Sequence, residues 1–148
     1  MSEGLVLDAG DRFRYGADAV SLGRDRTYAL SLRHFFVTAA TAGARAGWTI
    51  RTVGYSYGLL TEEGRELLTY HWHAIGPSPV VSPHLHLGAG LLRPELARPF
   101  GRTHWPTGPV TLPEVLRVAV ADLGVEPLRA DWRERLAEAD AISRASLG

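Results

Sequence analysis

The sequence predicts an α+β fold in which a small antiparallel sheet is packed by one or two C-terminal helices. Two observations predict the sheet and its partner helices. Aromatic and β-branched residues dominate about 48–60 and 65–73, which flank a turn-like tetrad ending in Gly64. Apolar residues then recur at helical spacing over about 112–123 and 132–145.

The composition is that of a globular protein with balanced charge. The chain has 148 residues, 45% of them hydrophobic and 22% charged, and no repeat or linker divides it. We therefore expect one domain over 1–148. The formal net charge is zero, which argues against strong non-specific DNA binding. The chain has no cysteine, no leader-like N-terminus and no apolar run of the ~20 residues that a bilayer requires. These features favour a cytoplasmic protein that does not contact a membrane.

The first part of the chain gives the weakest pattern. Residues 1–25 are rich in Gly and Asp and are expected to form an irregular extension, with 12–15 as its one extended piece. Residues 28–38 fit either a strand or the start of a helix, and their aromatic and β-branched content favours the strand. His34, beside two phenylalanines, is interpreted as a residue at the edge of the core.

The two central strands can be given a register. With Leu60 opposite Arg65, large apolar partners meet on one face, in the pairs Val53–Trp72, Tyr55–Tyr70 and Tyr57–Leu68. On the other face small residues meet mainly histidines, in the pairs Thr52–His73, Gly54–His71, Ser56–Thr69 and Gly58–Leu67. A slip of one residue would scramble both faces, so the match supports the register.

A further strand is expected at 84–87, where two histidines share one face, and we expect it to pair with 65–73. Residues 88–109 are rich in Gly and Pro and are expected to be irregular. Of the two helices, the first has Thr111 as a good N-cap. Asp131 and Glu134 resemble a capping box for the second, whose narrow apolar stripe places it at the domain edge or against a partner.

Two His-x-His pairs on neighbouring predicted strands form the candidate site. They place four imidazoles on one face of the sheet, those of His71, His73, His84 and His86. Side chains two apart on a strand lie roughly 6.5–7 Å from one another, and directly facing ones about 4.5–5.5 Å. His104, in a loop flanked by prolines, is placed to fold over this patch.

Three functions fit such a patch. The imidazoles can be structural, bonding to loop carbonyls that the prolines leave free. They can serve as acid and base, because imidazole titrates near pH 6.5. The natural reaction is then phosphodiester transfer in RNA, with the phosphate held by an arginine such as Arg51, Arg65 or Arg102.

The third function is metal binding. Zn²⁺ or another divalent transition metal would be held by three of the four imidazoles of His71, His73, His84 and His86, with His104 or Glu95 as an extra ligand. The spacing matches neither the helical His-Glu-x-x-His site nor the cupin pattern, because the first acid after His86 is Glu95. No Walker loop, Gly-x-Gly-x-x-Gly or Gly-x-Ser-x-Gly is present, which weighs against an NTPase, a dinucleotide enzyme and an α/β-hydrolase.

Four motifs follow one another over about 48–124. They are Tyr55-Ser56-Tyr57-Gly58-Leu59-Leu60, a strand ending Tyr70-His71-Trp72, then Pro83-His84-Leu85-His86-Leu87-Gly88, and a capped helix after Pro106-Thr107-Gly108-Pro109. In this order they resemble the small TumE-like toxins of bacterial toxin–antitoxin systems. The resemblance implies a compact α+β protein, a toxic activity directed at RNA and a cognate helix-turn-helix antitoxin as partner. Only His84 and His86 match a distinctive position and are carried over.

The leading hypothesis from the sequence is a toxin-like, metal-independent ribonuclease that needs no cofactor. Its candidate catalytic residues are His84, His86, His71, His73, Arg51 and Arg65. The alternative is a non-enzymatic metal- or ligand-binding domain that uses the same histidine face. A third hypothesis is an accessory protein with structural histidines.

Overall fold

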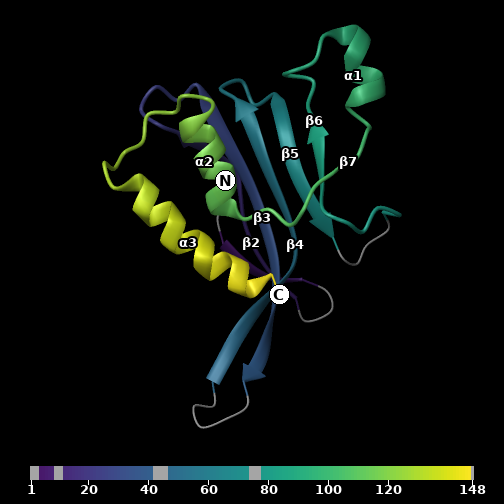
Figure 1. Ribbon diagram of the computed structural model, residues 1–148. Helices are drawn as coiled ribbons and strands as arrows, with labels where there is room; N and C mark the ends of the chain where they lie inside the picture. The colour runs from purple at the N-terminus through teal and green to yellow at the C-terminus, as the bar shows by residue number, and fades with distance from the viewer. Residues whose placement is uncertain (1–3, 9–11, 42–46, 74–77, 148) are drawn as a thin grey trace.

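The computed structural model describes residues 4–8, 12–41, 47–73 and 78–147 and has an α+β fold (Figure 1). A seven-stranded antiparallel sheet runs in chain order, each strand pairing with the next: β1 (Gly4–Asp8), β2 (Arg12–Leu22), β3 (Tyr28–Thr41), β4 (Gly47–Thr61), β5 (Glu66–His73), β6 (His84–Leu87) and β7 (Trp105–Pro106). The helices are α1 (Pro94–Phe100), α2 (Leu112–Ala121) and α3 (Trp132–Ser146). None of the described helices combines the length and apolar character needed to cross a bilayer.

Most predicted elements are present, but two segments expected to be irregular contain helices or strands. The strands expected at 48–60, 65–73 and 84–87 correspond to β4, β5 and β6, and the uncertain segment 28–38 is a strand. The segment expected to be irregular over 1–25 instead contains β1 and all of β2. The backbone of β2 pairs with the long strand β3. Without β2, the N–H and C=O groups along that side of β3 would be unpaired at the edge of the sheet. The region 88–109 likewise contains α1 and β7.

The core lies between β4 and α2. Alternate residues of β4 point toward the helices, and Tyr55, Tyr57 and Leu59 are almost fully buried there. The rings of Tyr55 and Tyr57 stack at 4.7 Å between centroids. Tyr55 Oη also accepts a hydrogen bond of 2.8 Å from the backbone N–H of Val110, just before α2. Val115 of α2 packs against this cluster with no exposed surface.

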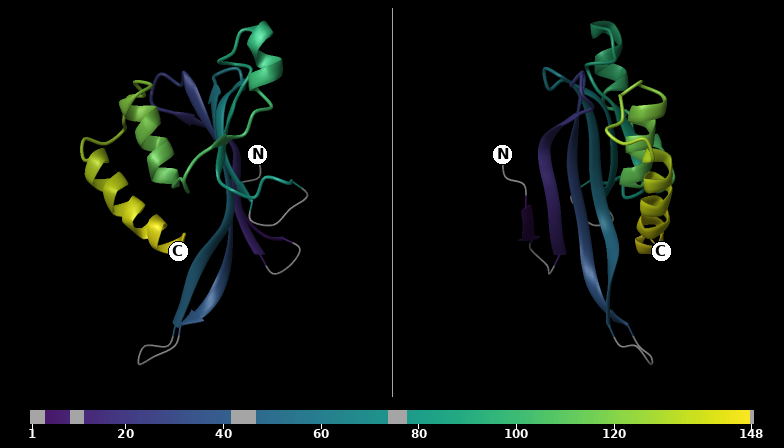
Figure 2. Two further views of the ribbon diagram at one scale, coloured as in Figure 1. Left: turned by 45° about the vertical axis from the view of Figure 1, so that its right-hand side comes forward. Right: turned by 90° about the vertical axis from the view of Figure 1, so that its left-hand side faces the viewer.

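The two long C-terminal helices cover one face of the sheet (Figure 2). Thr111 caps α2 as predicted, within a capping box that includes Glu114. The box predicted at Asp131 is absent, because Arg129 and Arg135 bind the Asp131 carboxylate instead. Among its described residues α3 has none that is buried, which agrees with its predicted place at the domain edge.

The predicted register of β4 and β5 is wrong by two residues. The turn holds three residues, because Thr61 rather than Leu60 lies opposite Arg65 and Gly64 takes a φ of +77°. A bulge at Leu67 adds the second residue of shift. Since strand faces alternate with a period of two, the double shift keeps both predicted faces. The observed pairs are Tyr55–Trp72, Tyr57–Tyr70 and Leu59–Leu68 on one face, and Gly54–His73, Ser56–His71 and Gly58–Thr69 on the other.

Thr52 lies on the face opposite to the predicted one. The pairing of β3 with β4 is irregular between Gly54 and Thr52, which leaves Val53 as an extra residue. This irregularity turns Thr52 toward the helices, where its Oγ1 lies 3.2 Å from Nε2 of His34.

Candidate metal centre

Five histidines gather on the face of the sheet that turns away from α2 and α3. Tyr70 and Trp72 of β5 pack against the helix-side core, so His71 and His73 point the other way. His84 of β6 lies opposite His71, and both therefore share this face. We call the five residues His71, His73, His84, His86 and His104 the histidine cluster.

His104 joins the cluster through the short strand β7. The pairs His84–Pro106 and Leu85–Trp105 place the preceding residue, His104, beside His86. The imidazole of His104 lies 4.6 Å from that of His86 and 4.8 Å from that of His84, measured between ring centroids. The sequence pattern predicted that this loop residue folds over the patch, and the structure places it there.

The cluster contains two groups with metal-ligand spacing. One is His71, His73 and His84, and the other is His84, His86 and His104; within each group the ligand nitrogens lie within 4.8 Å of one another. Ring centroids are closer in the second group, at 4.6–4.9 Å, than in the first, where the distances reach 6.0 Å. Both groups contain His84, which is therefore the centre of the cluster.

His84 has one nitrogen engaged and one without a partner. Its Nδ1 lies 2.8 Å from the backbone carbonyl oxygen of Ser82, and because a carbonyl can only accept, Nδ1 carries the proton. Nε2 is then a hydrogen-bond acceptor with a free lone pair. It has no hydrogen-bond partner among the described residues, and because His84 is only 1% exposed, solvent does not reach it freely either. A buried acceptor without a partner costs about 1–3 kcal/mol. A bound cation would remove that cost.

The electrostatics favour the neutral imidazole at three members of the cluster, His71, His73 and His86. The pKa of His71 is lowered to about 4, most strongly by burial and further by the neighbouring imidazoles and Arg33. Burial and the nearby imidazoles also lower the pKa values of His73 and His86. Neutral imidazole is the form that binds metal, because its lone pair is free.

The floor beside the cluster is lined by small and polar residues. Gly54 and Ser56 of β4 lie opposite His73 and His71, whereas the predicted register paired Gly54 with His71. Arg33 of β3 follows in the same row, opposite Ser56. Arg33 was not predicted from the sequence. The face of the sheet on which its side chain lies can be assigned only once 28–38 is known to be a strand. The Oγ1 of Thr69, opposite His86, is buried and also lacks a partner among the described residues.

The other predicted site residues lie outside the two histidine groups. Arg65 lies in the turn between β4 and β5, with its guanidinium 3.7 Å from the Glu63 carboxylate. Arg51 is exposed on β4 opposite Val37, and Arg102 is exposed in the loop before β7. Glu95, considered as an extra ligand, belongs to the first turn of α1.

Comparison with known proteins does not assign this chain to a family. No family model matches the sequence, and neither a curated protein nor a solved structure is significantly similar to it. The resemblance to TumE-like toxins therefore stays a prediction.

Proposed function

We propose that this protein binds one divalent transition-metal ion on the histidine cluster, with Nε2 of His84 as the central ligand. The observation that carries the proposal is this buried lone pair, which has no partner among the described residues and lies amid four other imidazoles. The hydrogen bond from Nδ1 to Ser82 supports it, since metal-binding histidines commonly donate their second ring N–H to a carbonyl. That bond fixes both the tautomer and the ring orientation.

The geometry favours one ion rather than two. The two groups share His84, and with Nδ1 protonated this residue has a single nitrogen to offer. We place the ion in the group with the closer rings, His84, His86 and His104. His71 and His73 lie farther from His84, with ring centroids 5.7 and 6.0 Å from it, and are candidates for a further ligand.

The ligand chemistry indicates which ions fit. Both groups consist of histidines alone within the described residues, and the chain has no cysteine. Imidazole suits Zn²⁺, Cu²⁺ and Ni²⁺, whereas Mg²⁺ and Ca²⁺ prefer oxygen ligands. Three neutral ligands leave the full charge of the ion uncompensated and a coordination position open, as in catalytic zinc sites. His104 is exposed, so such a position would face solvent.

The test begins with protein stripped by a chelator. Zn²⁺ is titrated calorimetrically, and Co²⁺ is added in parallel because its visible spectrum reports imidazole coordination. We expect one ion per chain, a higher Tm with Zn²⁺ and no response to Mg²⁺. His84→Ala should lose the ion. His34→Gln is the matched control, because His34 is the one histidine outside the cluster.

Failure of the wild-type protein to bind Zn²⁺, Ni²⁺ or Cu²⁺ at micromolar concentration would overturn the proposal. So would His84→Ala protein that binds Zn²⁺ as tightly as the wild type, with His34→Gln as the reference. If the loss in His84→Ala came from unfolding alone, its circular dichroism spectrum would differ from that of the stripped wild type. His104→Ala, at an exposed position, gives a second variant that is free of this problem.

The ribonuclease hypothesis is tested with the same preparations. Acid–base catalysis needs one imidazolium beside one neutral imidazole, and burial shifts His71, His73 and His86 toward the neutral form by lowering their pKa values. A metal-independent toxin would cleave RNA after chelation, and His86→Ala would abolish the cleavage. Cleavage that appears only with added metal would instead assign the activity to the metal centre.

A further inference from the structure

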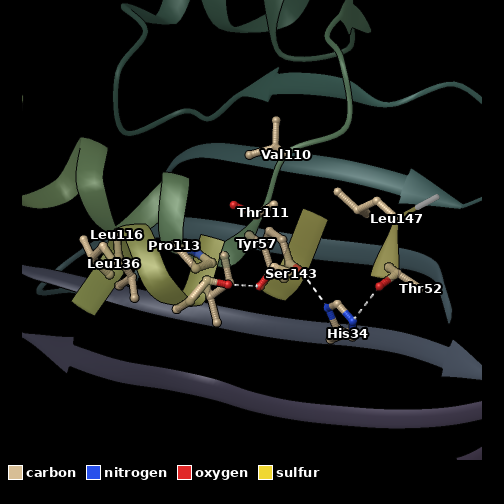
Figure 3. Close-up of a pocket in the computed structure, with 12 residues that line it drawn as sticks. His34, Thr52, Tyr57, Val110, Thr111, Pro113, Leu116, Leu136, Ser143 and Leu147 are labelled. Atoms are coloured by element: carbon tan, nitrogen blue, oxygen red, sulfur yellow. Dashed lines mark hydrogen bonds between the residues drawn. The ribbon is translucent and has the colours of Figure 1, made fainter. Parts of the chain in front are cut away.

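A cavity lies on the face of the sheet opposite to the histidine cluster. It has a volume of about 330 Å³, is partly open to solvent and is lined by residues of β3, β4, α2, α3 and the segment just before α2 (Figure 3). Ligand pockets have volumes of roughly 300–1,000 Å³, so this one suits a small molecule.

The helix α3 borders the cavity without filling it. Leu136, Ala139 and Ser143 line the cavity from α3, and none of them is buried. The helix is joined to α2 by polar contacts beyond this row, from Arg144 to Glu114 and from Thr111 to Asp140. These contacts hold α3 over the sheet while the space beneath it stays open.

Polar groups meet at one end of this otherwise apolar cavity. Nδ1 of His34 lies 2.6 Å from Tyr57 Oη, and Nε2 lies 3.2 Å from Thr52 Oγ1, which in turn lies 2.9 Å from Ser146 Oγ (Figure 3 shows the contacts of His34). The hydroxyl of Tyr57 can both donate and accept hydrogen bonds, and only one of these bonds is made to His34. The hydroxyl can therefore form another hydrogen bond to a ligand. Its role as donor or acceptor follows the His34 tautomer, and a ligand hydroxyl can complement either.

The lining also carries no charge. Among the described residues that line it there is no Asp, Glu, Lys or Arg, and burial lowers the pKa of His34, which favours its neutral form. A carboxylate entering the cavity would lose its hydration without meeting a cation, which is costly. The lining is thus complementary to an uncharged ligand.

We propose that this cavity is a binding site for a small, uncharged and mainly apolar molecule whose single hydroxyl group hydrogen-bonds to Tyr57 Oη. The site is independent of the histidine cluster, because Tyr57 and His34 point to the helix side of the sheet. Its ligand would bind in the same way with or without a metal on the other face.

The test uses 1-naphthol as the probe and 1-naphthoate as its charged counterpart. Isothermal titration of the full chain should give one 1-naphthol per chain, and 1-naphthoate should bind at least tenfold more weakly. Ala139→Leu fills the cavity from α3 and should weaken 1-naphthol binding at least tenfold. Ala141→Leu is the matched control, because Ala141 is an exposed residue of the same helix and Leu is nearly as good a helix former as Ala.

Absence of 1-naphthol binding to the wild type would overturn the proposal, and so would equal binding by Ala139→Leu and Ala141→Leu proteins. Equal affinities for 1-naphthol and 1-naphthoate would overturn the uncharged ligand class. Ala139→Leu is expected to fold, since it adds apolar volume to an empty space, and its Tm checks this directly. Chelator should leave the affinity for 1-naphthol unchanged.

Discussion

His71 and His84 lie directly opposite each other on β5 and β6, with ring centroids 5.7 Å apart. The hydrogen bonds between the two strands therefore set the distance between two members of the histidine cluster. Because β6 contributes two of the five histidines and β7 positions a third, the cluster exists only when this edge of the sheet is formed. Metal binding and the stability of this edge should be coupled.

The two histidine groups can be distinguished by substitution. We predict that His104→Ala weakens Zn²⁺ binding at least tenfold, because it removes a ligand from the group with the closer rings. His73→Ala, in the wider group, should weaken binding less than threefold. Competition titration against a chromogenic chelator measures both affinities. The reverse order of effects would place the ion among His71, His73 and His84.

The metal-free protein should lose stability in mildly acidic solution. Burial holds the pKa of His71 at about 4 in the folded protein, below the value of 6.5 that it has when unfolded. The unfolded chain therefore binds the proton first, and the stability present above pH 6.5 is lost as the pH falls toward 4. His71→Gln should flatten the decline of Tm across this window in the presence of chelator. An unchanged decline in that variant would show that other groups cause it.

Gly88 should not tolerate a side chain. A Cβ at this position would lie 2.0 Å from the backbone oxygen of Glu66, where β6 ends against β5. Since a backbone group cannot move aside cheaply, Gly88→Ala should destabilise the fold by about 3 kcal/mol in urea unfolding. Gly108→Ala is the control and should be neutral, because apart from Gly108 and its chain neighbours no described residue has an atom within 4 Å of the added Cβ. Similar effects of both substitutions would contradict the close approach.

Tyr55 should stabilise the start of α2 through its hydroxyl. Tyr55→Phe keeps the stacked ring but leaves the Val110 N–H without its 2.8 Å acceptor. We expect a loss of about 1–3 kcal/mol in the free energy of unfolding, the cost of an unpaired, partly buried donor. Tyr70→Phe, on the neighbouring strand, should change the stability by less than ~0.5 kcal/mol. A neutral Tyr55→Phe variant would show that water replaces the hydroxyl.

The fold class and the contents of the sheet faces followed from local patterns. Alternation along β4 and β5 separates tyrosines from glycines and histidines, and this survived a register error because two residues of shift preserve the faces. The Thr111 cap was predictable for a similar reason, since a cap depends on residues within one turn. The edge strand β1, and β2 beyond its extended piece at 12–15, were missed, because their segment has little strand pattern and pairs with a neighbour that the sequence does not identify.

The sequence by itself determined that four histidines share one face, because strand periodicity is a local property of the chain. Only the tertiary structure decided that His104 completes the cluster, because this requires β7 to pair with β6 although α1 lies between them in the sequence. It also decided the protonation of His84, through the Ser82 carbonyl and the burial of the ring. The turn and bulge between β4 and β5 and the cavity beneath α3 depend on how these segments pack against each other. The spacing of residues in the sequence does not show that packing.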